Sequence, residues 1–493
     1  MRIIKTAVLW LVGLVAAVAA VVLGLQIIYK LSPVALSPET VALDERAAKV
    51  PVVTENGYRA YGLLAPKDVD PVRYGRCLVD AQNSQREERQ ALYKASPSMT
   101  DKAAYEAYWK PFTDRAEVAA RGCAQGGAYV SLPKALADMR IKPGMTAAQW
   151  QALATFTPDP LIVARAEAVW AGDARRLGAA PDAPMIQFAN LIQLERWRIA
   201  RAVLAWDSGD RPQAVTAWKR SINDWVKSAD DTLIDAMISA AALSQVMIGM
   251  QDAVSRSERI DNSTAEAALT ALVPVESMPQ AVADSIVTEW QSMSALIKSM
   301  PTLPSQLYLT GQGDPGVLVR ALDHAAKLTY DVNDTLNRMG AANVQTQRSV
   351  LAAARGKPVA QSEWEGLTTG CASLGKWEYL CLPLLRNPTG RILVGVNAPA
   401  HAGITAPDYA DYGVRIADVR NLAAATRLTI EARRLALSGT ALASFVASAP
   451  SGMRDVFTGK PFSYDPVAKH LRIELHSRSS VLGDKEKGYE LAL

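Results

Sequence analysis

The chain has 493 residues, enough for two or three domains. Hydrophobic residues make up 49% and charged residues 21%, which is typical of a globular protein with a full core. The formal net charge is only +4, and no run of Lys or Arg stands out beyond the N-terminal apolar stretch. The sequence therefore lacks the basic footprint of a nucleic-acid-binding protein, and we exclude nucleic acid as a partner.

The first predicted element is an apolar stretch from Thr6 to Ile28, preceded by Arg2 and Lys5. At about 1.5 Å rise per residue it is long enough to cross a hydrocarbon core of roughly 30 Å. A cleaved signal peptide is the alternative, because Ala17–Ala19 resembles a cleavage site. Cleavage there would divide the apolar run, so the sequence predicts an uncleaved transmembrane anchor at residues 1–30, inserted through residues 6–28.

The charges beside this stretch predict its orientation. Arg2 and Lys5 precede it, whereas Glu39 and Asp44 are among the first charges that follow Lys30. The positive-inside rule then places the N-terminus in the cytoplasm of a bacterium and the bulk of the chain in the periplasm, anchored to the inner membrane. Small residues spaced for close helix approach are also compatible with a homodimer; these are Gly13, Ala17 and Ala20.

The four cysteines predict two disulfides, because their number is even and the predicted compartment is oxidising. Proximity in sequence pairs Cys77 with Cys123 and Cys371 with Cys381. Neither pair has the spacing of a redox or zinc motif, and none of the four histidines pairs with another ligand at metal-binding spacing. We therefore predict no metal site.

The chain divides into four predicted parts. After the anchor, residues 31–51 are rich in Pro and polar residues and predict a linker. Helical signals then dominate residues 52–355, which we expect to form a helical periplasmic domain, either a bundle or an irregular αα-hairpin solenoid. Residues 356–493 are expected to form an α+β region. Alternation of Leu471, Ile473 and Leu475 with polar residues predicts a terminal β-hairpin turning near Asp465.

The clearest local unit is a predicted αα-hairpin over residues 188–229. Its first helix would end at Gly209, and the second would begin after Asp210 with Pro212 in its first turn. The unit resembles one tetratricopeptide repeat, although no second copy is evident. Its tryptophans predict core filling or, alternatively, an aromatic partner-binding surface; the candidates are Trp206, Trp218 and Trp225.

Further helices are predicted downstream of this hairpin. Residues 233–250 are apolar on almost every side, but Asp235, Ser244 and Gln245 favour a buried core helix over a second membrane span. Three more helices are expected at residues 278–300, 316–355 and 410–438.

Three short motifs contain residue types used in known chemistry but lack the context that this chemistry requires. Gly311, Gly313 and Gly316 match a GxGxxG pattern but lack the second strand of a dinucleotide-binding unit. Ser373 and Lys376 form SxxK without its partner motifs. Glu363 and Glu365 are expected to be solvated surface charges. We therefore predict neither catalytic residues nor a cofactor.

The segment Asp455–Asp465, DVFTGKPFSYD, resembles a DPFTGKPLxY segment found near the ends of pseudopilin-like and other bacterial envelope proteins, with Val456 in place of Pro. More loosely, the layout resembles uncharacterised proteobacterial proteins with one N-terminal anchor and a helical ectodomain. The resemblance implies an envelope setting, and a loop and strand rather than a catalytic site.

These observations lead to one expected function and its alternatives. We expect a membrane-anchored periplasmic binding or scaffold protein whose partner is an envelope protein, a peptide or a cell-wall component. An envelope hydrolase acting on peptidoglycan or lipid, and a carrier of lipids or small molecules, are the alternatives.

Overall fold

A computed structural model of the chain describes most of the helical body. The described residues are 20–22, 24–49, 53–84, 107–108, 110–111, 122–123, 132, 140–173, 188–299, 329–357, 386–387, 390–391, 406–477 and 488–493. Several sequence-based predictions fall outside these ranges; they are the Cys371–Cys381 pair, the GxGxxG, SxxK and paired-glutamate motifs, and Gly13 and Ala17 of the anchor.

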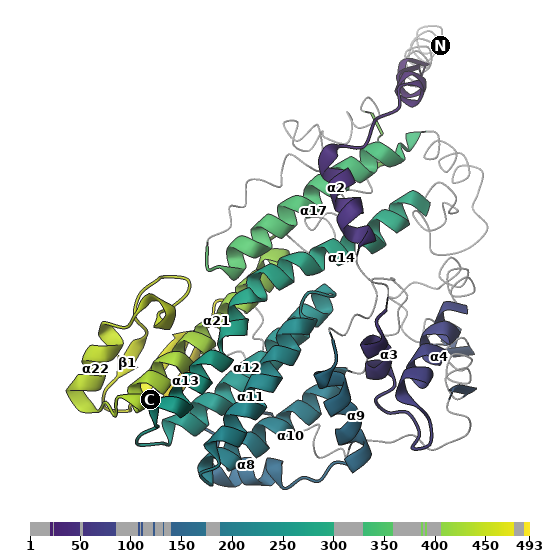
Figure 1. Cartoon of the computed structure of the whole chain (residues 1–493). Coiled ribbons are helices and arrows are strands. Elements are labelled where there is room, and N and C mark those ends of the chain that lie inside the picture. Colours follow the sequence, from purple (N-terminus) through teal and green to yellow (C-terminus); the bar gives the residue numbers. More distant parts are fainter. Residues whose placement is uncertain are drawn as a thin grey trace, which may run out of the picture.

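The fold is mainly helical, as predicted, with a small antiparallel sheet at the C-terminus (Figure 1). The α-helices are α2 (Pro38–Ala48), α3 (Glu55–Tyr61), α4 (Pro71–Ser84), α8 (Ala147–Ala154), α9 (Pro160–Ala171), α10 (Phe188–Asp207), α11 (Arg211–Ser228), α12 (Leu233–Ser255), α13 (Asn262–Ala271), α14 (Met278–Ser299), α17 (Val332–Ala354), α21 (Ala406–Arg434) and α22 (Gly439–Ala447).

The predicted αα-hairpin is confirmed by α10 and α11. Gly209 turns the chain at a φ of 94°, a backbone conformation that costs glycine little because it lacks a Cβ. The Asp210 side chain then caps α11 by accepting a hydrogen bond from the Gln213 N–H at 3.2 Å, and Pro212 lies in the first turn. Local signals therefore fix both ends of this turn.

Helix α12 is the centre of the core. By length and composition it is apolar enough to cross a membrane, with a mean hydropathy of 1.6, but 72% of that window is buried inside the protein. It packs against α10, α11 and α21, so it is the core helix that the sequence predicted. The same hydrophobic core includes Val350, Ile416 and Leu471, so the predicted boundary between residues 355 and 356 does not separate two cores.

Residues 31–51 are not an extended linker. Helix α2 lies within them, capped by Ser37, and packs on α14 and α17 in a second hydrophobic cluster that contains Leu43 and Trp290. The Trp290 indole N–H donates to an Asp44 carboxylate oxygen at 2.9 Å. The linker prediction failed because Pro at the first helical position starts a helix as readily as it marks a loop.

The end of the N-terminal apolar stretch is held against the body. Ala20–Leu31 is helical and projects from one end of the molecule beside α17 (Figure 1). The Lys30 ammonium donates to the Tyr330 carbonyl at 2.9 Å, and the Arg386 guanidinium donates to the Tyr29 carbonyl at 3.1 Å. Residues 1–19 lie outside the described part, so the membrane anchor stays a prediction.

The C-terminal sheet has three strands in the order β1 (Ser463–Asp465), β2 (His470–Glu474) and β3 (Gly488–Ala492), all antiparallel. The β1–β2 hairpin matches the predicted one, and β3 adds a strand that the sequence analysis missed. Leu471 and Ile473 are buried, as their alternation predicted. Before β1, Asp455–Pro461 forms a loop whose Asp455 carboxylate accepts a hydrogen bond from the Asn421 amide at 2.9 Å.

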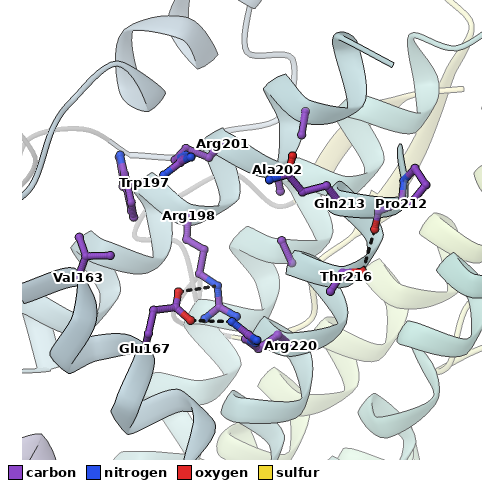
Figure 2. A pocket seen from close by; sticks show the side chains of 12 residues that line it. Val163, Glu167, Trp197, Arg198, Arg201, Ala202, Pro212, Gln213, Thr216 and Arg220 are labelled. Atoms are coloured by element: carbon purple, nitrogen blue, oxygen red, sulfur yellow. Dashed lines mark hydrogen bonds and ion pairs between the residues drawn. The ribbon is translucent and has the colours of Figure 1, made fainter. Parts of the chain in front are cut away.

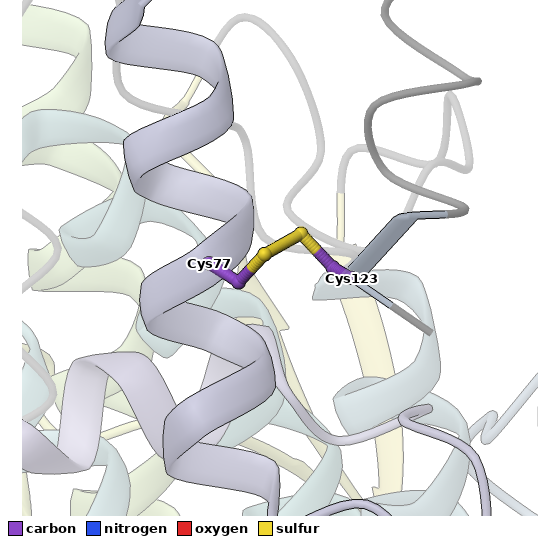
Figure 3. The surroundings of a disulfide bond; sticks show 2 residues. All are labelled: Cys77 and Cys123. Carbon is purple, nitrogen blue, oxygen red and sulfur yellow. A yellow bond between two sulfur atoms is a disulfide. The ribbon is translucent and has the colours of Figure 1, made fainter. Parts of the chain in front are cut away.

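Cys77 on α4 and Cys123 form the predicted disulfide, with a Cα–Cα distance of 5.8 Å (Figure 3). Cys123 belongs to a small hydrophobic cluster with Ala65 and Tyr74, separate from the main core. The bond closes a loop over a sequence separation of 46 residues. It therefore joins α4 covalently to Cys123, which belongs to the same cluster.

Candidate functional site

A pocket of about 520 Å³ lies between α9, α10 and α11 (Figure 2). This volume is within the range of about 300–1,000 Å³ that is typical of ligand sites. Its lining residues come from one stripe of each helix; they are Val163, Glu167, Trp197, Arg198, Arg201, Ala202, Ala205, Pro212, Gln213, Thr216, Ala217 and Arg220.

The pocket exists because small side chains meet where the two arms of the hairpin face each other. Ala202 and Ala205 line it from α10, and Ala217 lines it from α11. On α10 and α11 the lining positions follow the i, i+4, i+8 spacing of one face, and on α9 the two lining positions are i and i+4. The shape of the cavity is therefore set by the sequence of the hairpin and by its register.

Three arginines and one glutamate give the pocket its charge. Arg220 donates a hydrogen bond to the Glu167 carboxylate at 2.8 Å, and the Arg198 Nε lies 4.0 Å from the same carboxylate (Figure 2). The Arg201 guanidinium stacks over the Trp197 ring, with its Cζ 5.0 Å from the ring centroid. Among the described residues no carboxylate lies within ion-pair distance of Arg201, so its guanidinium is a positive charge of the lining that is left without an ion pair.

A buried ion cluster supports the wall of the pocket. Arg198 is 6% exposed, and its Nη1 atom lies 3.6 Å from Glu195 and 3.5 Å from Asp224, both buried. Trp170 covers the guanidinium, with Cζ 4.5 Å from the ring centroid. Neither Nη atom of Arg198 has a hydrogen-bond partner within the described residues. Arg198 therefore balances two buried carboxylates and fixes the position of its own helix face.

Neither of the two first-turn residues of α11 that line the pocket, Pro212 and Gln213, offers a free backbone donor. Pro212 has no N–H, and the Gln213 N–H already donates to the Asp210 side chain. The Thr216 hydroxyl donates to the Pro212 carbonyl at 2.8 Å (Figure 2). Recognition of an anion here would therefore rely on guanidinium groups.

The pocket and the N-terminal apolar helix lie at opposite ends of the molecule. In Figure 1 the helix Ala20–Leu31 projects from one end, whereas α8, α9 and α10 lie at the other. The core helices α12, α14 and α21 connect the two ends through direct packing. A ligand in the pocket would thus be held far from that helix by a continuous helical body.

The tryptophans proposed from the sequence as a partner-binding surface are not on the surface. Trp218 and Trp225 have no exposed area and Trp206 is 3% exposed, so all three fill the core. Trp206 packs on Trp218 and donates its indole N–H to the Ser257 hydroxyl at 2.9 Å. The partner-surface interpretation is wrong for these residues because the hairpin's apolar stripe faces α12.

The sequence analysis missed the residues that line the pocket. Arg198, Arg201 and Arg220 belong to no motif of the sequence, and Glu167 lies on a helix that was not singled out. A signal was present in the hairpin itself, because Trp197 and Arg201 are four positions apart, the spacing of a stacked pair on one helix face. Their meeting with Glu167 depends on packing between helices, which the sequence pattern does not encode.

Comparison with known proteins adds no assignment, because no family model, no curated protein and no solved structure matches the chain. Among the described residues no group of histidine, cysteine or acidic side chains is arranged to hold a metal ion.

Proposed function

We propose that this chain is a single-pass, membrane-anchored binding protein of the bacterial cell envelope, with its N-terminus in the cytoplasm and its body in the periplasm. The observation that carries the proposal is the arginine- and tryptophan-lined pocket at the end of the body opposite the apolar helix. Its partner would be an envelope protein or a peptide segment that enters this pocket.

Two features support a binding role over hydrolysis. The Glu167 carboxylate, which lines the pocket, accepts a hydrogen bond from Arg220 and lies near Arg198. It is therefore engaged in ion pairs and is poorly placed to act as a catalytic acid or base. The lining combines small apolar side chains with a few charged groups, the composition of a recognition site. Both features fit a pocket that holds a partner.

The hydrogen bonds between the N-terminal helix and the body favour a body that is held rigidly on its anchor. Bonds from Lys30 and Arg386 hold the end of this helix, and the Asn333 and Asn337 amides donate to the Val34 and Ala35 carbonyls at 2.8 and 2.9 Å. A chain held at successive residues does not swing as a flexible tether. The pocket would thus be presented at a fixed distance from the bilayer.

The test is site-directed photo-crosslinking in cells that produce the tagged full-length chain. A photoreactive phenylalanine analogue at Gln213, in the pocket, is compared with the same analogue at Lys219, an exposed position on α11 that does not line it. We expect a discrete crosslinked partner from Gln213 and none from Lys219. Equal labelling from both positions, or no partner from either, would contradict the proposal.

Orientation is tested separately with protease added to intact spheroplasts. The proposed topology predicts digestion of the body without lysis, whereas a cytoplasmic control protein stays intact. Protection of the body until the cells are lysed would overturn the periplasmic assignment while leaving the pocket to be tested on its own.

A further inference from the structure

The geometry points to a specific ligand for this pocket: a short extended peptide segment of the partner, with one acidic side chain and one apolar side chain two residues apart. This inference rests on the proposed binding function and names the chemistry that the pocket would recognise.

The charge of the lining favours a ligand with one negative charge. Arg198 is balanced by the buried carboxylates of Glu195 and Asp224, and Arg220 pairs with Glu167. Arg201 has no acidic partner within the described residues, so its guanidinium is the charge that a single carboxylate would neutralise. Arg201 is held in place by stacking on Trp197, which lowers the entropy lost when it binds. Arg220 is bonded to Glu167 through one Nη atom, and its side chain is 54% exposed. Both arginines can therefore donate to an incoming carboxylate.

The available donors favour a carboxylate over a phosphate. Phosphate sites commonly use free backbone N–H groups at a helix N-terminus. The two first-turn residues of α11 that line this pocket offer none, since Pro212 has no N–H and the Gln213 N–H donates to the Asp210 side chain. Glu167 would also repel a doubly charged phosphate more strongly than a singly charged carboxylate. A planar guanidinium fork matches a carboxylate without help from the backbone.

The dimensions of the lining favour a peptide in an extended conformation. The lining stripe on α10 runs from Trp197 to Ala205, which spans about 12 Å at about 1.5 Å per residue. An extended chain covers that length with about three to four residues, at about 3.3 Å each. A carboxylate beside Arg201 would leave an apolar side chain about 6 Å away, beside Ala205 and Pro212. This separation matches residues i and i+2 of an extended segment.

The test uses the full-length chain in detergent and a fluorescein-labelled Glu-Ala-Leu peptide with an amidated C-terminus, measured by fluorescence anisotropy. We expect saturable binding, at least tenfold weaker binding of the Gln-Ala-Leu peptide, and at least tenfold weaker binding to the double variant Arg201→Met, Arg220→Met. The matched control is Arg211→Met, because Arg211 also stacks on a tryptophan of the hairpin, Trp206, but does not line the pocket. Its affinity should change less than twofold.

The outcomes separate this inference from the proposed function. Equal binding of the Glu and Gln peptides, no saturable binding, or displacement by inorganic phosphate at a lower concentration than by unlabelled peptide would each overturn the ligand assignment. If the Gln213 crosslink to a partner persists in the Arg201→Met, Arg220→Met variant, the binding function stands and the acidic-segment inference fails. Circular dichroism of each variant must match that of the parent chain for the comparison to count.

Discussion

Arg198 shows how one buried residue connects stability to the site. It lies between Glu195 and Asp224, so its removal would take away the positive charge that lies 3.6 and 3.5 Å from these two buried carboxylates. We predict that Arg198→Met lowers the free energy of unfolding by about 3–5 kcal/mol. Arg201→Met, on the same helix but exposed, should change it by less than about 1 kcal/mol. Urea unfolding followed by circular dichroism compares them, and equal effects would contradict the role given to Arg198.

Asp252 carries a prediction about pH. Burial raises its pKa from 3.8 to about 6, although the Gly144 and Met145 N–H groups donate to it at 3.3 and 3.2 Å. The folded protein therefore binds this proton more tightly than the unfolded chain does. The resulting stabilisation is fully present below about pH 4 and is lost as the pH rises through 6, a change of about 3 kcal/mol.

The measurement for Asp252 is urea unfolding of the parent chain and Asp252→Asn between pH 4 and pH 7. The parent chain should lose stability relative to the variant as the pH rises, because the amide of the variant does not titrate. A stability difference that stays constant across this range would show that Asp252 has an ordinary pKa in the fold.

At the scale of single residues, the sequence predicted which side chains are buried better than it predicted which neighbours they contact. Alternation in the terminal hairpin placed Leu471 and Ile473 correctly in the core. The periodic stripe of Trp218 and Trp225 was also recognised, but periodicity alone does not tell which neighbour a stripe will face. The pocket was not predicted for the same reason, because Glu167 and Arg220 come together only when α9 and α11 pack against each other.

At the scale of elements, the helix ends that have local sequence signals were predictable, whereas the distances at which helices pack were not. The α10–α11 turn follows from Gly209, Asp210 and Pro212, all within a few residues of one another. The close crossing of α21 over α17 has no such signal. There, a Cβ added at Gly413 would lie 2.3 Å from the Val350 carbonyl oxygen.

Gly413→Ala therefore tests this helix crossing. Alanine favours a helix by about 1 kcal/mol over glycine, but here its methyl group meets backbone that cannot move without shifting α17. We predict a net loss of about 2 kcal/mol or more in the free energy of unfolding. Gly452→Ala is the control, since nothing lies within 4 Å of its added Cβ. Thermal unfolding of both variants checks the prediction, and a stabilised Gly413→Ala would refute it.

At the scale of the whole molecule, the disulfide cross-links a small hydrophobic cluster that is separate from the main core. Cys123 packs with Ala65 and Tyr74 in a cluster apart from the main core. We predict that Cys77→Ser with Cys123→Ser costs about 2–4 kcal/mol, because the unfolded chain regains the entropy of the closed loop. Hydrogen exchange should rise first in residues 53–84. A uniform rise that includes α12 would instead indicate that the region unfolds together with the core.

The overall class was predictable because helical periodicity recurs along the chain, but long-range organisation was not. The helix α2 was missed in a segment whose prolines suggested a linker, and the division at residue 355 does not appear in the core. The first error concerns a local helix start at Pro38 that was taken for a loop, whereas the shared core depends on contacts between residues that are far apart in sequence. Such contacts depend on the shapes of both partners, and a single sequence does not report them.

The docking of residues 29–48 has a consequence for the order in which the protein is made. These residues form hydrogen bonds with partners far along the chain: Lys30 with Tyr330, 300 positions later, Asp44 with Trp290, 246 later, and Tyr29 with Arg386, 357 later. At about 5–20 residues synthesised per second, these partners emerge roughly 10 to 70 s after the segment itself. Leu43 and its neighbours on α2 must wait through that interval with their apolar face uncovered. The part of the body that leaves the ribosome first is therefore among the last to reach its native contacts.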